Sequence, residues 1–274
     1  MIKIFLTVRN RLAISKKCIK ALKKHSKIDH EIYVYNNLTN YKQTEHFEYF
    51  THLLKKGHIT QLTFNTEEST YGSFSKASSF SQFGKCHELD YRNNCDFILI
   101  LDNDMIVLPG WDKTLLKAWK DIKSRQMKDI KIITQHPGGI KHAAHNVDIA
   151  GFKSVSGKLG GSGFWAIQPD FFKDIGYIKL ERLKGSNKRH DQLYWNLLEE
   201  KSKGKHYIIS LKTDMAIHTG PVAGSICNRL ERNKNVKNKL DTIKYEESEE
   251  KIESMDFDSF LIMIKKGVEG SLKW

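Results

Sequence analysis

Two carboxylates, Asp102 and Asp104, stand one residue apart directly after the apolar run 97–101. Five apolar residues bounded by polar ones predict a buried strand, and the carboxyl end of such a strand is where open α/β sheets bind ligands. Carboxylates at this spacing can share one divalent cation. Oxygen ligands favour Mg²⁺ or Mn²⁺, which proteins usually hold through one or two carboxylates together with substrate phosphates. The triplet Asp102-Asn103-Asp104 therefore predicts metal-assisted chemistry on a nucleotide diphosphate.

The elements that must position these carboxylates alternate along the chain. Strands are expected at 2–8, 31–35, 59–64, 97–101, 130–134, 164–167 and 207–211, with an extended stretch at 214–218. Helices are expected at 12–27, 42–56, 113–125, 170–175 and 191–201, and another opens within 71–77. Residues 136–163, rich in glycine and histidine, predict loops or irregular hairpins. The alternation predicts an α/β fold with a Rossmann-like, mainly parallel sheet, right-handed crossovers and flanking helices.

The last fifty residues differ from this pattern. We expect one domain over residues 1–225 and an extension over residues 226–274. The extension contains a basic segment, an acidic run and a final amphipathic helix near 256–266. The expected buried stripe of that helix consists of Phe257, Phe260, Leu261 and Ile264.

Composition excludes several classes of protein. The chain has 274 residues, of which 39% are hydrophobic and only 4 are proline, so it can form a core and is not disordered. Its four cysteines form no CxxC pair, which predicts neither a zinc site nor a disulfide framework and favours a reducing, cytoplasmic compartment. The first residues do not resemble a signal peptide, and no apolar run approaches the ~20 residues that span a bilayer.

The charge balance predicts an affinity for anions. Lysine and arginine number 45 against 32 acidic residues, a net charge of +13. Lys16, Lys20, Lys23 and Lys27 recur at helical spacing and predict an exposed basic face, and residues 229–244 form a second basic segment. Such surfaces attract nucleic acid, anionic lipid or an acidic glycan. The alternatives are a solvated surface without a partner and a field that recruits an anionic sugar nucleotide.

Several motifs occur in the order typical of one enzyme family. They are Thr7 to Arg11 after the first strand, Asn36-Asn37 after the second, Gly72 to Ser79, Asp102-Asn103-Asp104, Gly160 to Ala166, His190-Asp191, and His218 in Ile-His-Thr-Gly. Over residues 1–222 this series resembles a GT-A fold glycosyltransferase of the large inverting family that builds polysaccharides and glycoconjugates. The chain departs from that pattern at Ser79, where asparagine is common, and at His190, where an acidic residue usually precedes the base.

The resemblance implies a role for particular residues. Contacts with the nucleotide-sugar donor fall to Thr7, Arg9, Asn36, Lys76, Asp102, Asn103 and Gly161. The implied metal ligands are Asp104, Asp102 and His218, with Mn²⁺ or Mg²⁺ as the cofactor. Asp191 is the implied catalytic base, and Trp165 and His190 are the implied acceptor contacts.

Each role has a structural alternative. Asp102 and Asp104 could cap the next turn, and Asp191 could cap the helix that follows it. His218 could be a satisfied buried histidine, and Trp165 could belong to the core.

The function expected from these residues is metal-dependent, inverting transfer of a sugar from a nucleotide diphosphate to an acceptor hydroxyl. The acceptor is either a glycan or lipid-linked saccharide, or a hydroxymethylated base in DNA, as in phage enzymes that act in the host cytoplasm. The basic surface and the composition favour DNA. A nucleotidyltransferase is a rival, but residues 8–12 lack the glycine of a phosphate loop. A non-catalytic DNA-binding protein is a second rival. The sugar, the nucleotide and the oligomeric state stay open.

Overall fold

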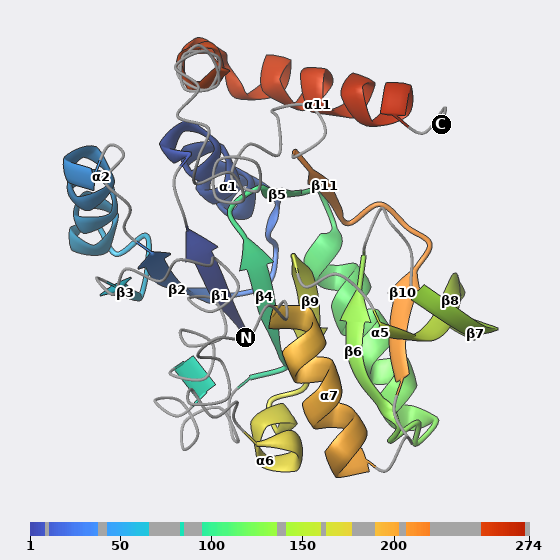
Figure 1. The fold of residues 1–274 in the computed structure, drawn as a ribbon. Helices are drawn as coiled ribbons and strands as arrows, with labels where there is room; N and C mark the ends of the chain where they lie inside the picture. Colours follow the sequence, from blue (N-terminus) through green and yellow to red (C-terminus); the bar gives the residue numbers. More distant parts are fainter. Residues whose placement is uncertain are drawn as a thin grey trace, which may run out of the picture.

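A computed structural model describes most of the chain (Figure 1). The described residues are 1–8, 11–37, 43–65, 83–84, 95–135, 141–159, 163–176, 190–202, 207–219 and 248–271. The strands are β1 (Ile2–Val8), β2 (His30–Asn37), β3 (Gln61–Asn65), β4 (Phe97–Asp102), β5 (Met105–Val107), β6 (Ile130–Thr134), β7 (Lys141–Ile149), β8 (Phe152–Leu159), β9 (Phe164–Ile167), β10 (Tyr207–Leu211) and β11 (Ala216–His218). The helices are α1 (Leu12–His25), α2 (Gln43–Lys55), α5 (Trp111–Ser124), α6 (Phe171–Ile175), α7 (His190–Ser202) and α11 (Phe257–Ser271).

A nine-stranded sheet forms the centre of the molecule, in the order β3-β2-β1-β4-β9-β6-β10-β8-β7. Parallel pairing joins β3, β2, β1 and β4, and it also joins β6 and β10. Only β9 and β8 pair antiparallel with both of their neighbours, so seven of the nine strands described in this sheet point the same way. This confirms the mainly parallel α/β sheet expected from the sequence.

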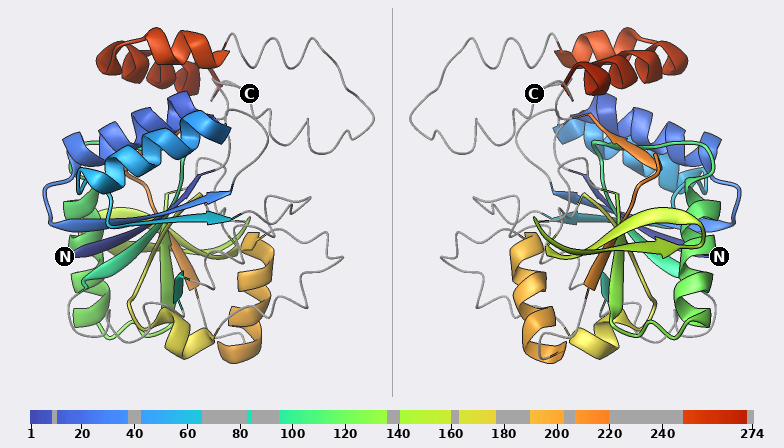
Figure 2. Two further views of the ribbon diagram at one scale, coloured as in Figure 1. Left: turned by 90° about the vertical axis from the view of Figure 1, so that its left-hand side faces the viewer. Right: turned by 90° about the vertical axis from the view of Figure 1, so that its right-hand side faces the viewer.

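Helices cover both faces of the sheet (Figure 2). One face packs against α1, α2, α5 and α11, and the other packs against α6 and α7. Successive residues of a strand point to opposite faces, and β4 shows this directly: Leu99 and Leu101 join the first layer, whereas Ile98 and Ile100 join the second. The apolar run of β4 is continuous because both of its faces are buried.

Residues 141–159 are more regular than expected. Instead of irregular hairpins, β7 and β8 form one long antiparallel hairpin whose register shifts between Ala143 and His145. Its turn places Ala150 and Gly151 at φ 55° and 81°. Pairing with β10 continues the sheet through β8. Strand pairing therefore decides the structure of a segment whose small and polar residues have little strand propensity of their own.

The C-terminal residues share the core of the main domain. Ile252, Phe257, Phe260 and Ile264 are buried in the same hydrophobic cluster as the residues of β1 and α1. The expected buried stripe of the last helix is thus confirmed for three of its residues, whereas Leu261 is only partly buried. Figure 1 shows α11 lying across α1. The basic segment 229–244 lies outside the described residues.

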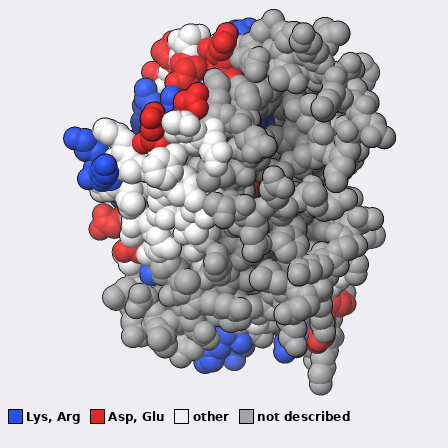
Figure 3. Space-filling view, turned by 60° about the vertical axis from the view of Figure 1, so that its left-hand side comes forward, with Lys and Arg blue, Asp and Glu red and all other residues white. Residues whose placement is uncertain are grey.

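The lysine face of α1 is exposed at Lys20, Lys23 and Lys27, as its spacing predicts, but part of this side of the helix is paired with C-terminal residues. Lys16 Nζ lies 2.5 Å from Glu253 Oε1, and Lys24 Nζ lies 2.8 Å from Asp258 Oδ1. Lys20 Nζ lies 5.5 Å from the centre of the Phe257 ring, within the range of a cation–π contact. In the upper left of Figure 3, acidic and basic side chains lie side by side. The sequence alone gives no sign of this pairing, because the partners lie more than 230 residues away in the chain.

Among the helices that the structure describes, none combines the length and apolarity needed to cross a membrane.

Candidate metal and donor site

The carboxyl ends of β1 and β4 lie side by side and open the site. The two strands are parallel neighbours with Thr7 opposite Asp102. The backbone N–H of Asn103 donates to Thr7 O (3.0 Å), and the N–H of Asp102 donates to Gly163 O (2.9 Å). Asp102 is therefore fixed at the end of a fully buried strand, between β1 and the start of β9. A side chain in this position faces the sheet edge at which α/β folds bind ligands.

Asp104 and His218 meet across a small second sheet. Asp104 lies in the turn between β4 and β5, and β11 pairs antiparallel with β5 so that His218 is opposite Met105. Thr219 fixes this register, because its N–H and its hydroxyl both donate to Asp104 O (2.9 and 3.1 Å). As a result, His218 Nε2 lies 3.2 Å from Asp104 Oδ2, although 114 residues separate them in the chain. The sequence placed both residues at one site, and the structure brings them together.

The electrostatics of this pair favour a cation. The pKa of His218 is raised above its usual value of 6.5. Burial lowers this pKa, but the hydrogen bond to Asp104 and the negative charges of Asp104 and Asp102 outweigh burial, while the charge of Arg11 opposes them. An imidazole held beside two carboxylates attracts a proton in the same way as it would attract a metal ion. The donor set of carboxylate and imidazole suits Mn²⁺ better than Mg²⁺.

The site has fewer protein ligands than a closed metal centre. Within the described ranges, no group of three or more His, Cys, Asp or Glu residues lies close enough together to enclose a metal ion. Asp104 and His218 could supply two positions, with Asp102 nearby. Such an open site fits an ion whose other positions are taken by diphosphate oxygens and water.

Gln135 anchors the strand that carries His218. It follows β6, and its Oε1 accepts hydrogen bonds from the N–H groups of both Met215 and Ala216 (2.5 Å each). Leu108 N–H donates to Met215 O (2.8 Å) at the same place. These bonds hold the first residue of β11 against β5 and so set the position of His218. The sequence carries no signal for this role, since a single glutamine after a strand is unremarkable.

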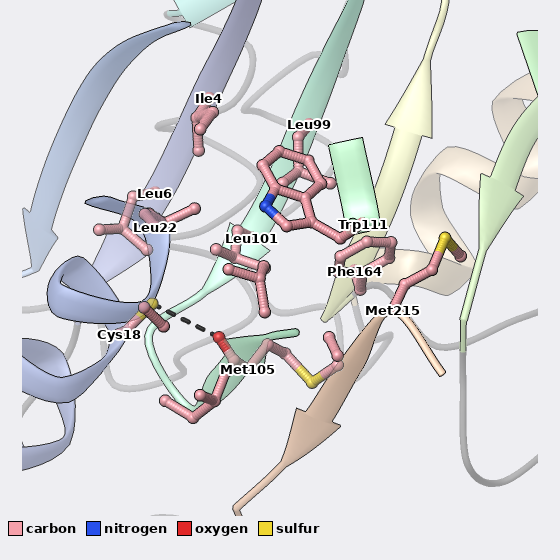
Figure 4. Packing of buried hydrophobic residues seen from close by; sticks show 14 of the residues in the cluster. Ile4, Leu6, Cys18, Leu22, Leu99, Leu101, Met105, Trp111, Phe164 and Met215 are labelled. Atoms are coloured by element: carbon pink, nitrogen blue, oxygen red, sulfur yellow. Dashed lines mark hydrogen bonds between the residues drawn. The ribbon is translucent and has the colours of Figure 1, made fainter. Parts of the chain in front are cut away.

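The acidic turn, Asp102-Asn103-Asp104, and the strand β5 that follows it are held by the inner face of α1 at three points. Asn103 Nδ2 donates to Ser15 Oγ (2.8 Å), Cys18 Sγ donates to Met105 O (3.4 Å; Figure 4), and His25 Nδ1 donates to Val107 O (2.8 Å). Burial raises the pKa of the Cys18 thiol, and the charges of Asp104 and Asp102 add to this, so the thiol stays protonated and can donate.

Asn103 had been expected to contact the donor. Its side chain is 7% exposed and points to α1, so its described contacts support the turn.

Of the other predicted site residues, Asn36 lies near the acidic turn and Trp165 lies in the core. Asn36 lies beside the end of β1, opposite Val8, where it is buried and its amide donates to His46 Nδ1 (3.4 Å). Trp165 is 1% exposed within the core layer that packs against α6 and α7. Stacking on an acceptor would need a ring face that solvent can reach, so the acceptor role is not carried further for Trp165.

Several predictions fall on residues that the structure does not describe. Arg9, Lys76 and Gly161 lie outside the described ranges, as does the helix start expected within 71–77. His190 and Asp191 form the first turn of α7, and only their backbone is described.

Comparison with known proteins supports the fold. No family model matches the sequence, and no curated protein matches it either. Among solved structures, the mannosyltransferase PcManGT from Pyrobaculum calidifontis, in complex with GDP-Man and Mn²⁺, matches with a TM-score of 0.55 at 9% identity, over 99% of this chain and 74% of that one. This likeness shows the fold, a GT-A type glycosyltransferase fold, and confirms the fold expected from the sequence.

Two bacterial proteins match less closely. Residues 1–349 of TarS from S. aureus match with a TM-score of 0.49 at 12% identity, over 89% of this chain and 69% of that one. GlyE from Streptococcus pneumoniae TIGR4, a glycosyltransferase, matches with a TM-score of 0.44 at 12% identity, over 99% of this chain and 64% of that one.

Proposed function

We propose that the protein is a metal-dependent, inverting glycosyltransferase that moves a sugar from a nucleotide-diphosphate donor to an acceptor hydroxyl. The observation that carries the proposal is the approach of His218 to Asp104, with Asp102 beside them, at the carboxyl edge of the sheet. A fold match that binds GDP-Man and Mn²⁺ supports the same reading.

The proposed reaction exchanges one bond at the anomeric carbon for another. The bond between the anomeric carbon and the departing phosphate oxygen breaks, and a bond from the acceptor oxygen to that carbon forms on the opposite face. Asp104 and His218 would hold Mn²⁺, and Asp102 would contact the ribose or the ion through water. Bound there, the ion would neutralise the charge that builds on the departing diphosphate.

Asp191 is proposed to take the proton of the acceptor hydroxyl. The residue stands in the first turn of α7, a helix that is anchored against the sheet by the buried side chains of Tyr194 and Leu198. An unperturbed aspartate is a weak base with a pKa of about 3.9. Burial or a neighbouring charge would have to raise that pKa for efficient proton transfer. Inversion follows from this role, because a single base and a single displacement invert the anomeric centre.

The acceptor proposed from the sequence was a hydroxymethylated base in DNA. The pairing of Lys16 with Glu253 weakens the contribution of the lysine face of α1 to that argument, although Lys20, Lys23 and Lys27 stay exposed. The net charge of +13 and the basic segment 229–244 still support it. A glycan acceptor needs neither feature, so both acceptors belong in the same assay, with the products followed by mass spectrometry.

Calorimetric titration tests the donor and metal site. The wild type should bind UDP or GDP tightly only when Mn²⁺ is present, and Asp104→Asn should abolish this metal dependence. Asp129→Asn is the matched control, since Asp129 is an exposed acid in the turn before β6. Wild-type nucleotide affinity that is the same with Mn²⁺ and with excess chelator, or Mn²⁺-dependent affinity that survives in Asp104→Asn, would contradict the proposal.

A further inference from the structure

The start of α1 lacks a cap of its own. Arg11 occupies the N-cap position without a side-chain capping hydrogen bond, and no acidic residue lies in the first turn. Arg11 also adopts the left-handed conformation, with φ 58° and ψ 58°. This region is unfavourable for residues other than glycine, so surrounding contacts must hold the backbone there.

Glu249 supplies the missing cap from the other end of the chain. Its Oε2 accepts a hydrogen bond from Ala13 N–H (3.0 Å), across 236 residues of sequence. The side chain is 3% exposed. A carboxylate at this position satisfies an N–H that has no partner within the helix and interacts favourably with the positive end of the helix dipole. Glu249 therefore stabilises the first turn of α1.

The C-terminal segment continues along the outer face of α1. One helical turn beyond Glu249, Glu253 pairs with Lys16. The ammonium group of Lys17 donates to the carbonyl oxygen of Met255. Phe257 then lies against the far end of α1, with its ring centre 5.8 Å from that of His25. Residues 249–257 thus follow α1 from its first turn to its last.

The inner face of the same helix holds the acidic turn. Ser15 Oγ donates to Arg11 O (3.0 Å) and accepts from Asn103 Nδ2 (2.8 Å), so the capped first turn is joined directly to the middle residue of Asp102-Asn103-Asp104. Cys18 adds a further contact with the first residue of β5. Every step between Glu249 and the turn is therefore either one hydrogen bond or one turn of helix.

We propose that Glu249 is a positioning residue for the metal-binding turn. It fixes the first turn of α1, and α1 in turn fixes residues 103–105. Residues 248–264 then act as a brace of the active domain, in contrast to an independent extension. The inference rests on the proposed function only in treating Asp104 as a metal ligand.

Hydrogen exchange of the full-length protein tests this inference without any assay of activity. Glu249→Ala should raise amide exchange in peptides covering 11–18 and 97–108 by roughly two- to thirtyfold, the range that corresponds to loss of a helix cap. Glu253→Ala is the matched control, because it removes a carboxylate from the same segment whose pairing with Lys16 is half exposed. In that control, exchange in 97–108 should stay at the wild-type level.

Glu249→Gln keeps the test decisive if Glu249→Ala does not fold. The amide oxygen of glutamine can still accept from Ala13 N–H, but it lacks the charge that strengthens this bond. Exchange in 97–108 should rise, by less than in Glu249→Ala. Unchanged exchange in 97–108 for the folded Glu249 variants, or an equal rise in Glu253→Ala, would overturn the inference.

Metal affinity separates this inference from the proposed function. If the wild type binds Mn²⁺ with nucleotide, Glu249→Ala should weaken that binding while Glu253→Ala leaves it unchanged. If the wild type binds no Mn²⁺ at all, the proposed function fails, and the exchange experiment still decides whether Glu249 positions the turn.

Discussion

The acidic turn at the end of β4 and the lysine face of α1 are two charged regions that the sequence marks equally clearly. The structure treats them differently. Asp104 keeps the surroundings expected of a ligand site, with His218 brought to it from the far end of the domain. Lys16 and Lys24, in contrast, are matched by carboxylates of the same chain. A charged pattern identifies a site only when its structural context restricts what can pair with it.

The two regions differ in how firmly the backbone and side chains are held. Asp102 ends a strand that is buried on both faces and Asp104 follows two residues later, so the strand fixes the point at which this turn leaves the sheet. The lysines lie on the outer side of a helix, where long side chains can turn to any nearby anion. The pairing of a flexible lysine is decided by the segment that happens to cover it, which here is residues 248–258.

The largest expected effect concerns catalysis. Asp191→Asn should retain nucleotide and Mn²⁺ binding but lose sugar transfer by about 10²- to 10⁴-fold, because an amide cannot accept the proton. Rates measured at saturating donor, with binding checked by calorimetry, would show this. Near-normal transfer by a folded Asp191→Asn would move the base elsewhere, and His190 would be the next residue to test.

A smaller effect is expected where the site depends on Gln135. Gln135→Leu leaves the backbone N–H groups of Met215 and Ala216, at the start of β11, without their acceptor and should lower the free energy of unfolding by about 1–3 kcal/mol. Gln135→Glu keeps an oxygen that can accept from both N–H groups and should recover most of the loss. Urea unfolding curves for the three proteins provide the measurement. Equal midpoints for wild type and Gln135→Leu would mean that β11 is held by other contacts.

The pH dependence of stability distinguishes the acidic turn from an ordinary surface. The folded pKa of His218 is raised, so the protonated ion pair with Asp104 stabilises the metal-free protein fully below the unfolded pKa of about 6.5. This contribution is lost as the pH rises through the higher folded pKa. The wild type should therefore exceed His218→Gln in stability at pH 5.5, and the difference should shrink by pH 8.5. A difference that grows with pH would show that the pair is not formed.

The smallest effect should distinguish the paired lysines from the exposed ones. Lys16→Ala removes an exposed ion pair and should cost about 0.2–1 kcal/mol in unfolding free energy. Lys23→Ala, on the exposed part of the same helix, should change stability less. Thermal unfolding at low and high salt measures both, and the difference between them should fall in high salt because charges are screened. Equal, salt-independent values would indicate that the lysine face is a uniform free surface.

Much of this architecture follows from the sequence because its strands are long apolar runs. The runs at 2–8 and 97–101 predict strands, and the acids after the second one predict the edge where ligands bind. The supports of the site are less visible. Gln135, Ser15 and Glu249 act through one or two hydrogen bonds to residues far away in the chain, and no periodicity marks such contacts. Trp165 shows the opposite error, since an aromatic residue near a glycine pair resembled a stacking platform but belongs to the core.

The central claim is that Asp104 and His218 hold one metal ion together with the donor. Electron spin echo measurements on Mn²⁺ bound with UDP or GDP test it directly, because a coordinated imidazole adds a ¹⁴N modulation to the manganese signal. The wild type should show this modulation. His218→Gln should lose it while some Mn²⁺ stays bound, and Asp104→Asn should bind little Mn²⁺. A manganese complex whose nitrogen modulation is the same in wild type and His218→Gln would contradict the account.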